Sequence, residues 1–142
     1  MLITILPMSK IEDAHLLEDL FGYFPSFHDA EVLRLILERN GGDGLPTLEA
    51  QISAFEITSE VVNGRYVLDK HCIVTLRFFA IDGLVLEDFN HQNALFGLSI
   101  KDISSYQLED LKFEIRFDAA HGMNAHFRCR SVQIKSVTPV SN

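Results

Sequence analysis

Apolar and polar residues alternate singly through most of the chain after residue 30, the pattern of β-strands with one buried face. Turn signals separate these runs, and the dipeptides Asn63-Gly64 and Asp82-Gly83 each predict a hairpin turn. Longer turns are expected from the runs NGGDG at residues 40–44 and HGMN at residues 121–124. The clearest alternating runs are residues 47–54, 72–78, 111–117 and 125–130. The pattern predicts a largely antiparallel sheet.

The first long strand is expected at residues 30–39. A strict period of two gives an apolar face and a mixed face, namely Leu33, Leu35 and Leu37 against Val32, Arg34, Ile36 and Glu38. By the same period Asp29 and Glu31 continue the leucine face, so at least one carboxylate is expected near the edge of the core. A buried carboxylate needs hydrogen-bond donors. The candidates are the backbone N–H groups of residues 24–27, His91 and Arg77.

An amphipathic helix is expected at about residues 10–22. The run SKIE at residues 9–12 fits a capping box, in which Ser9 accepts a hydrogen bond from a free backbone N–H group. Gly22 is a stop signal. The apolar stripe of the helix would lie on the sheet. The acidic back would face solvent and carries Glu12, Glu18 and Asp19.

These elements predict an α+β fold, predominantly antiparallel, in which about seven strands form a curled sheet or a sandwich. One N-terminal helix would cover an open face or end of it. Strands are expected from about residue 30 to residue 138, and residues 1–6 fit either an edge strand or a flexible start. The chain has 142 residues, 47% of them hydrophobic, which suits one core and a single domain over residues 1–142.

The charge of the chain is acidic and uneven. The formal net charge is −8, and residues 1–70 hold 12 acids against 5 bases, whereas residues 71–142 hold 8 against 7. An acidic surface repels phosphate, which disfavours nucleic acid and anionic membranes and favours a basic protein partner. The bases of the closing strands alternate with Glu114, so we expect cross-strand ion pairs on a solvated face there.

The sequence also indicates a cellular compartment. No apolar run reaches the roughly 20 residues that span a bilayer, and residues 1–6 lack the basic start of a secretory signal. We therefore expect a cytoplasmic protein. Cys72 and Cys129 then fit reduced thiols in the core.

Metal binding and catalysis are weakly indicated. The side chains that could ligate a metal ion are His28, Asp29, Glu31, His91, His121 and His126. Neighbours on a strand point to opposite faces, and none of the histidine spacings matches a helical ligand pair. His71 and Cys72 would also point apart, so the imidazole could not activate the thiol. We predict no metal, no cofactor and no catalytic residue.

Two segments remain candidates for binding. Residues 27–31 combine aromatic and polar side chains, and serve either as a buried polar brace or as a direct contact for a partner or ligand. The run FNHQN at residues 89–93 exposes Asn90 and His91 beside an aromatic ring, and serves either as a recognition loop or as a connector that satisfies its own backbone.

Several runs of the chain resemble the immunity protein 50 family of bacterial proteins. They are FPSFHDAEV at residues 24–32, AFE at 54–56, VTLRF at 74–78, FNH at 89–91 and FEIRF at 113–117. The likeness spans about residues 21–137, and FHDAE is its most specific part. The resemblance implies a small, cytoplasmic, mainly β protein that binds and neutralises a toxin domain. It implies no catalytic residues.

The leading hypothesis is therefore a non-enzymatic immunity protein with a basic toxin as its partner. The contact residues would come from the helix back or from the two loops, namely Glu12, Glu18, Asp19, His28, Asp29, Glu31, Asn90 and His91. One alternative is a small-ligand or metal-dependent enzyme or binding protein centred on residues 27–31 and His91. Another is a structural homodimer joined through an exposed strand edge.

Overall fold

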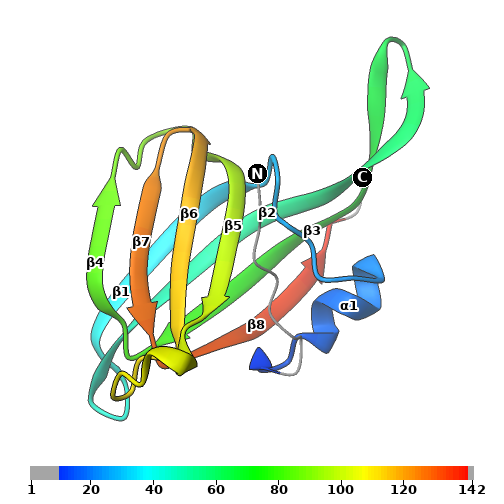
Figure 1. Cartoon of the computed structure of the whole chain (residues 1–142). Coiled ribbons are helices and arrows are strands. Elements are labelled where there is room, and N and C mark those ends of the chain that lie inside the picture. The colour runs from blue at the N-terminus through cyan, green and yellow to red at the C-terminus, as the bar shows by residue number, and fades with distance from the viewer. Residues whose placement is uncertain (1–9, 141–142) are drawn as a thin grey trace.

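The computed structural model describes residues 10–140, and within them the chain folds into one antiparallel eight-stranded sheet with one short α-helix (Figure 1). The strand order is β4-β7-β6-β5-β1-β2-β3-β8. The elements are α1 (His15–Phe21), β1 (Glu31–Gly42), β2 (Leu45–Val62), β3 (Arg65–Phe79), β4 (Asp82–Glu87), β5 (Ala94–Asp102), the 3-10 turn η2 (Ser104–Tyr106), β6 (Phe113–His121), β7 (Asn124–Cys129) and β8 (Ser131–Pro139). The predicted α+β, predominantly antiparallel fold is confirmed.

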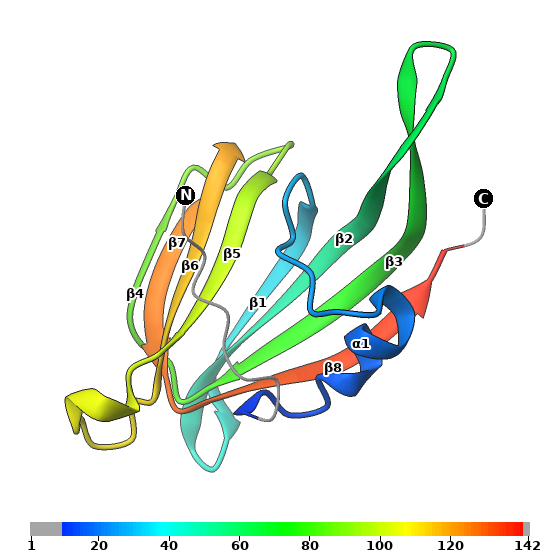
Figure 2. The same cartoon turned by 45° about the vertical axis from the view of Figure 1, so that its right-hand side comes forward.

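The sheet bends sharply between β1 and β5, because these strands share only the pair Glu31 and Ala94 in their ladder. On either side of this seam lie four strands, β4-β7-β6-β5 and β1-β2-β3-β8, and the two halves face one another (Figure 2). Their inner side chains meet in the core, where the Phe78 ring of β3 lies 5.1 Å from Phe127 of β7 and 6.0 Å from Phe117 of β6. The curled sheet thus encloses its own core.

The helix begins at His15, so the prediction of a start near Lys10 is wrong. The chain before it is attached to β8, where the Glu12 N–H group donates to the Val132 carbonyl (2.9 Å) and the Ile134 N–H group donates to the Glu12 carbonyl (2.8 Å). These long-range bonds replace the helical ones, and the proposed cap residue Ser9 lies outside the described residues, as do residues 1–6.

The end of the helix agrees with the sequence. Gly22 has a φ of 82° and its N–H group donates to the Glu18 carbonyl, which is the left-handed cap that glycine permits. Leu17 and Phe21 are buried and hold α1 against the sheet. The helix covers the β8 side of the sheet (Figure 2).

A β-bulge at Leu33 changes the predicted faces at the start of β1, while Leu35 and Leu37 share one face as predicted. The inner-face pairs are Val32 with Ile52, Leu35 with Ala50 and Leu37 with Leu48. The extra residue shifts the phase of the strand, so Leu33 is half exposed and Glu31 shares the outer face with Arg34. Glu31 therefore does not continue a leucine face, contrary to the prediction.

The turn predictions are confirmed in three places and wrong in one. Hairpin turns join β1 to β2, β2 to β3 at Asn63-Gly64, and β6 to β7. Asp82-Gly83 instead begins β4, which pairs with β7 and not with β3. The chain crosses there from one half of the sheet to the other, and the Ile81 N–H group donates to the Pro46 carbonyl at 3.0 Å. β8 is a further strand beyond the alternating run that ends at residue 130.

The β2–β3 hairpin extends beyond the rest of the sheet as a two-stranded ribbon (Figure 1). The pairing of β1 with β2 begins at Ser53, and the pairing of β8 with β3 begins at Cys72. We call residues 55–70 the ribbon.

No helix in the described part of the chain is long and apolar enough to cross a membrane.

Candidate functional site

The segment FHDAE forms a tight turn between α1 and β1. Phe27 and Asp29 have φ angles of 62° and 63°, in the left-handed region. Phe27 is buried, and the Asp29 N–H group donates to the Leu95 carbonyl of β5 at 2.8 Å. The turn is therefore fixed against β5 at the seam, and it presents the intervening His28 to solvent.

His28 is held in one orientation at the surface. Its Nδ1 lies 2.8 Å from the Phe96 carbonyl oxygen and so donates to it, and the ring packs edge-on against the Phe96 ring at 5.5 Å between centroids. Nε2 lies 3.6 Å from the Asp29 carboxylate, and both side chains are about half exposed. The pair can offer a partner either a hydrogen-bond acceptor or, after protonation, an ion pair.

Glu31 is used inside the fold. Its Oε2 accepts a 2.8 Å hydrogen bond from the Asn93 N–H group. The sequence predicted that a carboxylate here would need a donor, but the donor comes from Asn93 and not from residues 24–27, His91 or Arg77. Glu31 acts as a brace between β1 and the loop before β5.

Asn93 is the centre of this brace, and sequence reasoning named the run FNHQN that contains it but not Asn93 itself. Its side chain is buried; Nδ2 donates to the Asn90 carbonyl at 2.9 Å and to the Val32 carbonyl at 3.4 Å. Its Oδ1 accepts from the N–H groups of Asn90 (3.0 Å) and Met123 (3.3 Å). One amide thus joins three segments: the loop, β1 and the turn between β6 and β7.

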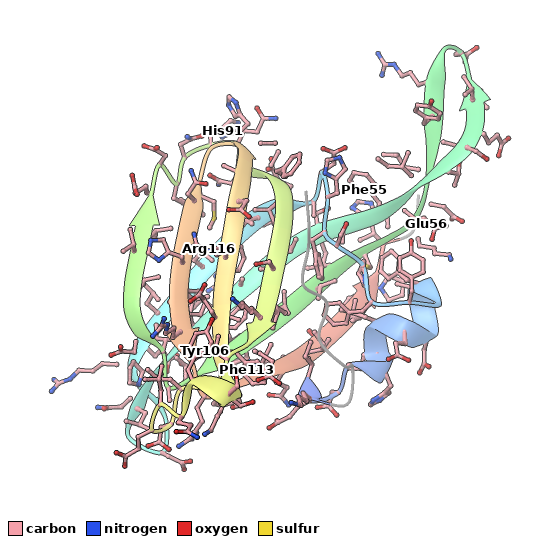
Figure 3. The ribbon with its side chains drawn as sticks, viewed as in Figure 1. Phe55, Glu56, His91, Tyr106, Phe113 and Arg116 are labelled. Atoms are coloured by element: carbon pink, nitrogen blue, oxygen red, sulfur yellow. The ribbon has the colours of Figure 1, made fainter. Side chains whose placement is uncertain are left out.

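The loop at residues 88–93 is a connector that satisfies its own backbone, and it also leaves His91 exposed. Asn90 donates from Nδ2 to the Asp88 carbonyl and accepts at Oδ1 from the Gln92 N–H group, both at 3.0 Å, so it organises the loop itself. His91 is exposed at the tip, above β6 in Figure 3. The structure brings this loop and the FHDAE turn to the same end of the sheet, joined through Asn93 and Glu31.

The acidic residues of the predicted helix back separate. Glu12 lies in the segment that pairs with β8, Glu18 is half-buried on α1, and Asp19 is exposed on α1. Figures 1 and 3 show the same view. In it α1 lies at the lower right, whereas the loop that carries His91 lies at the top, left of centre. The helix acids and the histidine loops are therefore two separate surfaces.

A third polar cluster lies at the base of the ribbon, and sequence reasoning missed it. The Tyr23 hydroxyl donates to Glu56 Oε2 at 2.7 Å, and Lys70 Nζ lies 3.4 Å from the same oxygen. Lys70 also donates to the Phe21 carbonyl at the end of α1. The pKa of the Tyr23 hydroxyl is raised, first by its hydrogen bond to Glu56, then by burial and by the Glu56 charge.

The outer face of β6 and β7 carries one cross-strand ion pair of the kind that the sequence predicted, between Glu114 and Arg128, and a second pair within β6, between Glu114 and Arg116. The Glu114 carboxylate lies 3.8 Å from Arg116 Nε and 3.5 Å from Arg128 Nε. The ring of Tyr106 lies nearby, 5.6 Å from Lys101 Nζ and 6.0 Å from the Arg128 guanidinium carbon (Figure 3).

The alternative hypothesis placed a metal or small-ligand centre at residues 27–31 and His91. Among residues 10–140, no group of three or more His, Cys, Asp or Glu side chains is placed to hold a metal ion. Four hollows of the described chain are lined by residues other than His28, Asp29, Glu31 and His91. Cys72 and Cys129 are free and buried.

These features define a small antiparallel β protein with an exposed polar loop at one end of the sheet and a two-stranded ribbon that extends beyond the sheet. The chain belongs to the immunity protein 50 family, whose family model matches residues 13–140. Membership of this family implies an immunity protein, with a toxin as its partner in general. No curated protein and no solved structure matches the chain.

Proposed function

We propose that this chain is a non-enzymatic, cytoplasmic immunity protein that binds and neutralises a cognate toxin domain. The observation that carries the proposal is the family match, which covers residues 13–140 and so nearly all of the chain. The exposed side chains at the loop end of the sheet support it, since His28, Asp29 and His91 are presented by backbone that hydrogen bonds fix in place.

The partner is a basic toxin domain. The chain carries a net charge of −8, with the acidic excess in residues 1–70. An acidic inhibitor associates rapidly with a basic partner because long-range attraction steers the encounter. Exposed acids on two surfaces contribute to this steering, Asp19 on α1 and Asp29 beside His28, whereas Glu31 contributes through the brace that it makes.

The test is protection and binding with a defined toxin domain, the one encoded beside this gene in its native bacterium. Cells that express this domain are expected to stop growing, and co-expression of the chain is expected to restore growth. Calorimetry with the purified proteins should show binding that weakens between about 50 mM and about 500 mM salt. Continued growth arrest with the folded chain present would refute the proposal.

Charge reversal then locates the steering surface. Asp19→Lys and Asp29→Lys should each lower the association rate several-fold and make it less sensitive to salt. Asp110→Lys, an exposed acid in the loop before β6, is the matched control and should change the rate less. If Asp19→Lys associates as fast as the wild type, α1 is not part of the steering surface.

A further inference from the structure

The ribbon has one apolar face, and its strand pairing shows which residues lie on it. Ile57 pairs with Leu68, and Val61 pairs with Tyr66. Directly paired residues of antiparallel strands share a face, and Tyr66 and Leu68 are two positions apart on one strand, so all four side chains lie on the same side. Their exposed fractions are 45% for Ile57, 50% for Leu68, 56% for Val61 and 63% for Tyr66.

This face continues onto the sheet at the base of the ribbon. Phe55 precedes Ile57 by two positions and lines a hollow of about 430 Å³ together with Ser53, Leu68 and His71. The floor of the hollow is fixed by a 2.7 Å hydrogen bond between Ser53 Oγ and His71 Nε2. The continuous surface, which we call the apolar stripe, consists of Phe55, Ile57, Val61, Tyr66 and Leu68.

The opposite face of the ribbon carries Val62, which is 50% exposed, near the tip, but at the base it is polar and attached to the body of the protein. Glu56 alternates with Phe55 and Ile57 and faces the Tyr23 hydroxyl and the Lys70 ammonium group. Further out, the Thr58 hydroxyl donates to the Val67 carbonyl across the two strands at 2.7 Å. The ribbon is therefore attached to the body of the protein through this opposite face, and the apolar stripe stays exposed and can contact a partner.

Nothing in the packing of the fold requires this stripe. The buried core ends on β2 at Ala54 and on β3 at Cys72, and the described ribbon residues beyond them contribute no side chain to it. A two-stranded hairpin is marginally stable alone in water, and exposed apolar groups lower solubility. Tyrosine is also enriched among the residues that dominate binding interfaces.

Charge indicates which partner covers the stripe. The ribbon also exposes the carboxylates of Glu60 and Asp69 and the guanidinium group of Arg65, on a chain with a net charge of −8. Docking on a second copy would bring like charges together, whereas a partner with lysine or arginine beside an apolar surface would complement both features. The charge therefore favours the basic toxin over a second copy of this chain.

The geometry points to the apolar stripe of the ribbon as the main toxin-binding surface, seated in an apolar groove of the toxin that is flanked by basic side chains. This inference rests on the proposed function, and it assigns the binding strength to the stripe and the steering to the exposed acids. The two contributions differ in their salt dependence, because apolar contacts persist at salt concentrations that screen surface charges.

The test compares two double variants for binding to the toxin domain encoded beside the gene. Tyr66→Ser with Leu68→Ser removes the centre of the stripe. Leu33→Ser with Tyr106→Ser is the matched control, since these side chains are 50% and 47% exposed and lie outside the ribbon. The stripe variant should raise Kd about 30-fold or more at both low and high salt, and the control by less than about threefold.

Hydrogen exchange of the wild-type chain supplies a second measurement that does not depend on the folding of a variant. Amides of residues 55–70 should exchange more slowly when the toxin domain is bound. Equal affinities for the two double variants, or unchanged exchange of the ribbon, would overturn the inference while the proposed function stands. Failure of the wild-type chain to bind would instead remove the proposed function and this inference with it.

Light scattering tests whether a second copy of this chain, and not the toxin, covers the stripe. The wild-type chain should be a monomer without the toxin. A dimer that the stripe variant converts to a monomer would show that a second copy covers the stripe, and would overturn the inference.

Discussion

The Tyr23 hydroxyl donates a 2.7 Å hydrogen bond to the Glu56 carboxylate, which ties the segment after α1 to the base of the ribbon. Lys70 completes the link from the other strand, since its ammonium group reaches both Glu56 and the last carbonyl of α1. The orientation of the ribbon therefore depends on three side chains that are distant in sequence.

Replacement of Tyr23 by phenylalanine tests this link. The hydroxyl is lost while the ring remains, so we expect a loss of about 0.5 kcal/mol in the free energy of unfolding, at the low end for a hydrogen bond because the side chain is half exposed. Amide exchange should accelerate at residues 55–57 and 68–70 more than in the core. Uniform acceleration, or none, would show that the bond does not anchor the ribbon.

The raised pKa of Tyr23 gives a dependence on pH. Its hydroxyl holds its proton more tightly in the folded state than at the ordinary value of 10.0, because ionisation would break the bond to Glu56 and place two negative charges together. This contribution to stability is present below about pH 10 and is lost as the pH rises through the folded-state pKa. Wild type and Tyr23→Phe should therefore converge in unfolding free energy at alkaline pH; a constant difference would contradict the assignment.

Asn93 should be the most sensitive polar position at the loop end of the sheet. Asn93→Ala removes bonds to the loop, to β1 and to the turn before β7, and leaves their buried partners unsatisfied, so we expect a loss of about 2–3 kcal/mol in denaturant unfolding. Asn90→Ala is the control, because its exposed amide bonds only within the loop. Equal losses would argue against a central role for Asn93.

Gly122 is required for a steric reason that Gly83 lacks. Both have positive φ angles, but a Cβ atom at Gly122 would overlap the Gln92 carbonyl oxygen and lie 2.8 Å from Asn93 Oδ1, while one at Gly83 would meet nothing within 4 Å. Gly83→Ala should cost about 1–2 kcal/mol, the strain of the left-handed conformation. Gly122→Ala should cost more, and thermal unfolding of the two variants measures the difference. Similar costs would mean that the loop yields easily.

The two cysteines should be inert in the native protein. Burial raises the pKa of the Cys72 thiol to about 11 and that of the Cys129 thiol to about 12. Both thiols stay protonated at about pH 8, and the thiolate is the reactive form. An aromatic disulfide reagent should therefore modify neither thiol until the chain unfolds, and both thereafter. Rapid modification of the native protein would show that the core opens readily.

The strands and most of the turns could be predicted because their signals are local. Alternation of single residues and dipeptides such as Asn63-Gly64 depend only on neighbouring positions. The start of α1 and the phase of β1 could not, because Glu12 exchanges hydrogen bonds with β8 and a bulge at Leu33 puts Glu31 and Val32 out of phase with the leucines that follow. Both errors come from tertiary contacts that override a sound local pattern.

The candidate binding surfaces also depend on parts of the chain that are distant in sequence. The sequence indicated that a carboxylate near residue 31 needed a donor, but the donor belongs to Asn93, far along the chain. The alternation around Ile57 and Leu68 is that of an ordinary half-buried strand. Whether such a face meets a second layer depends on strand order and on strand length, and only the structure shows that the ribbon extends past its neighbours.

The attachment of Glu12 to β8 has a consequence for the order in which the molecule is made. The segment before α1 bonds with Val132 and Ile134, which leave the ribosome long after it. The segment before α1 therefore cannot make these hydrogen bonds until almost the whole sheet has been synthesised. Contacts of such high sequence separation form slowly. Under the proposed immunity function, rapid protection of a cell would depend on a stock of this protein folded in advance.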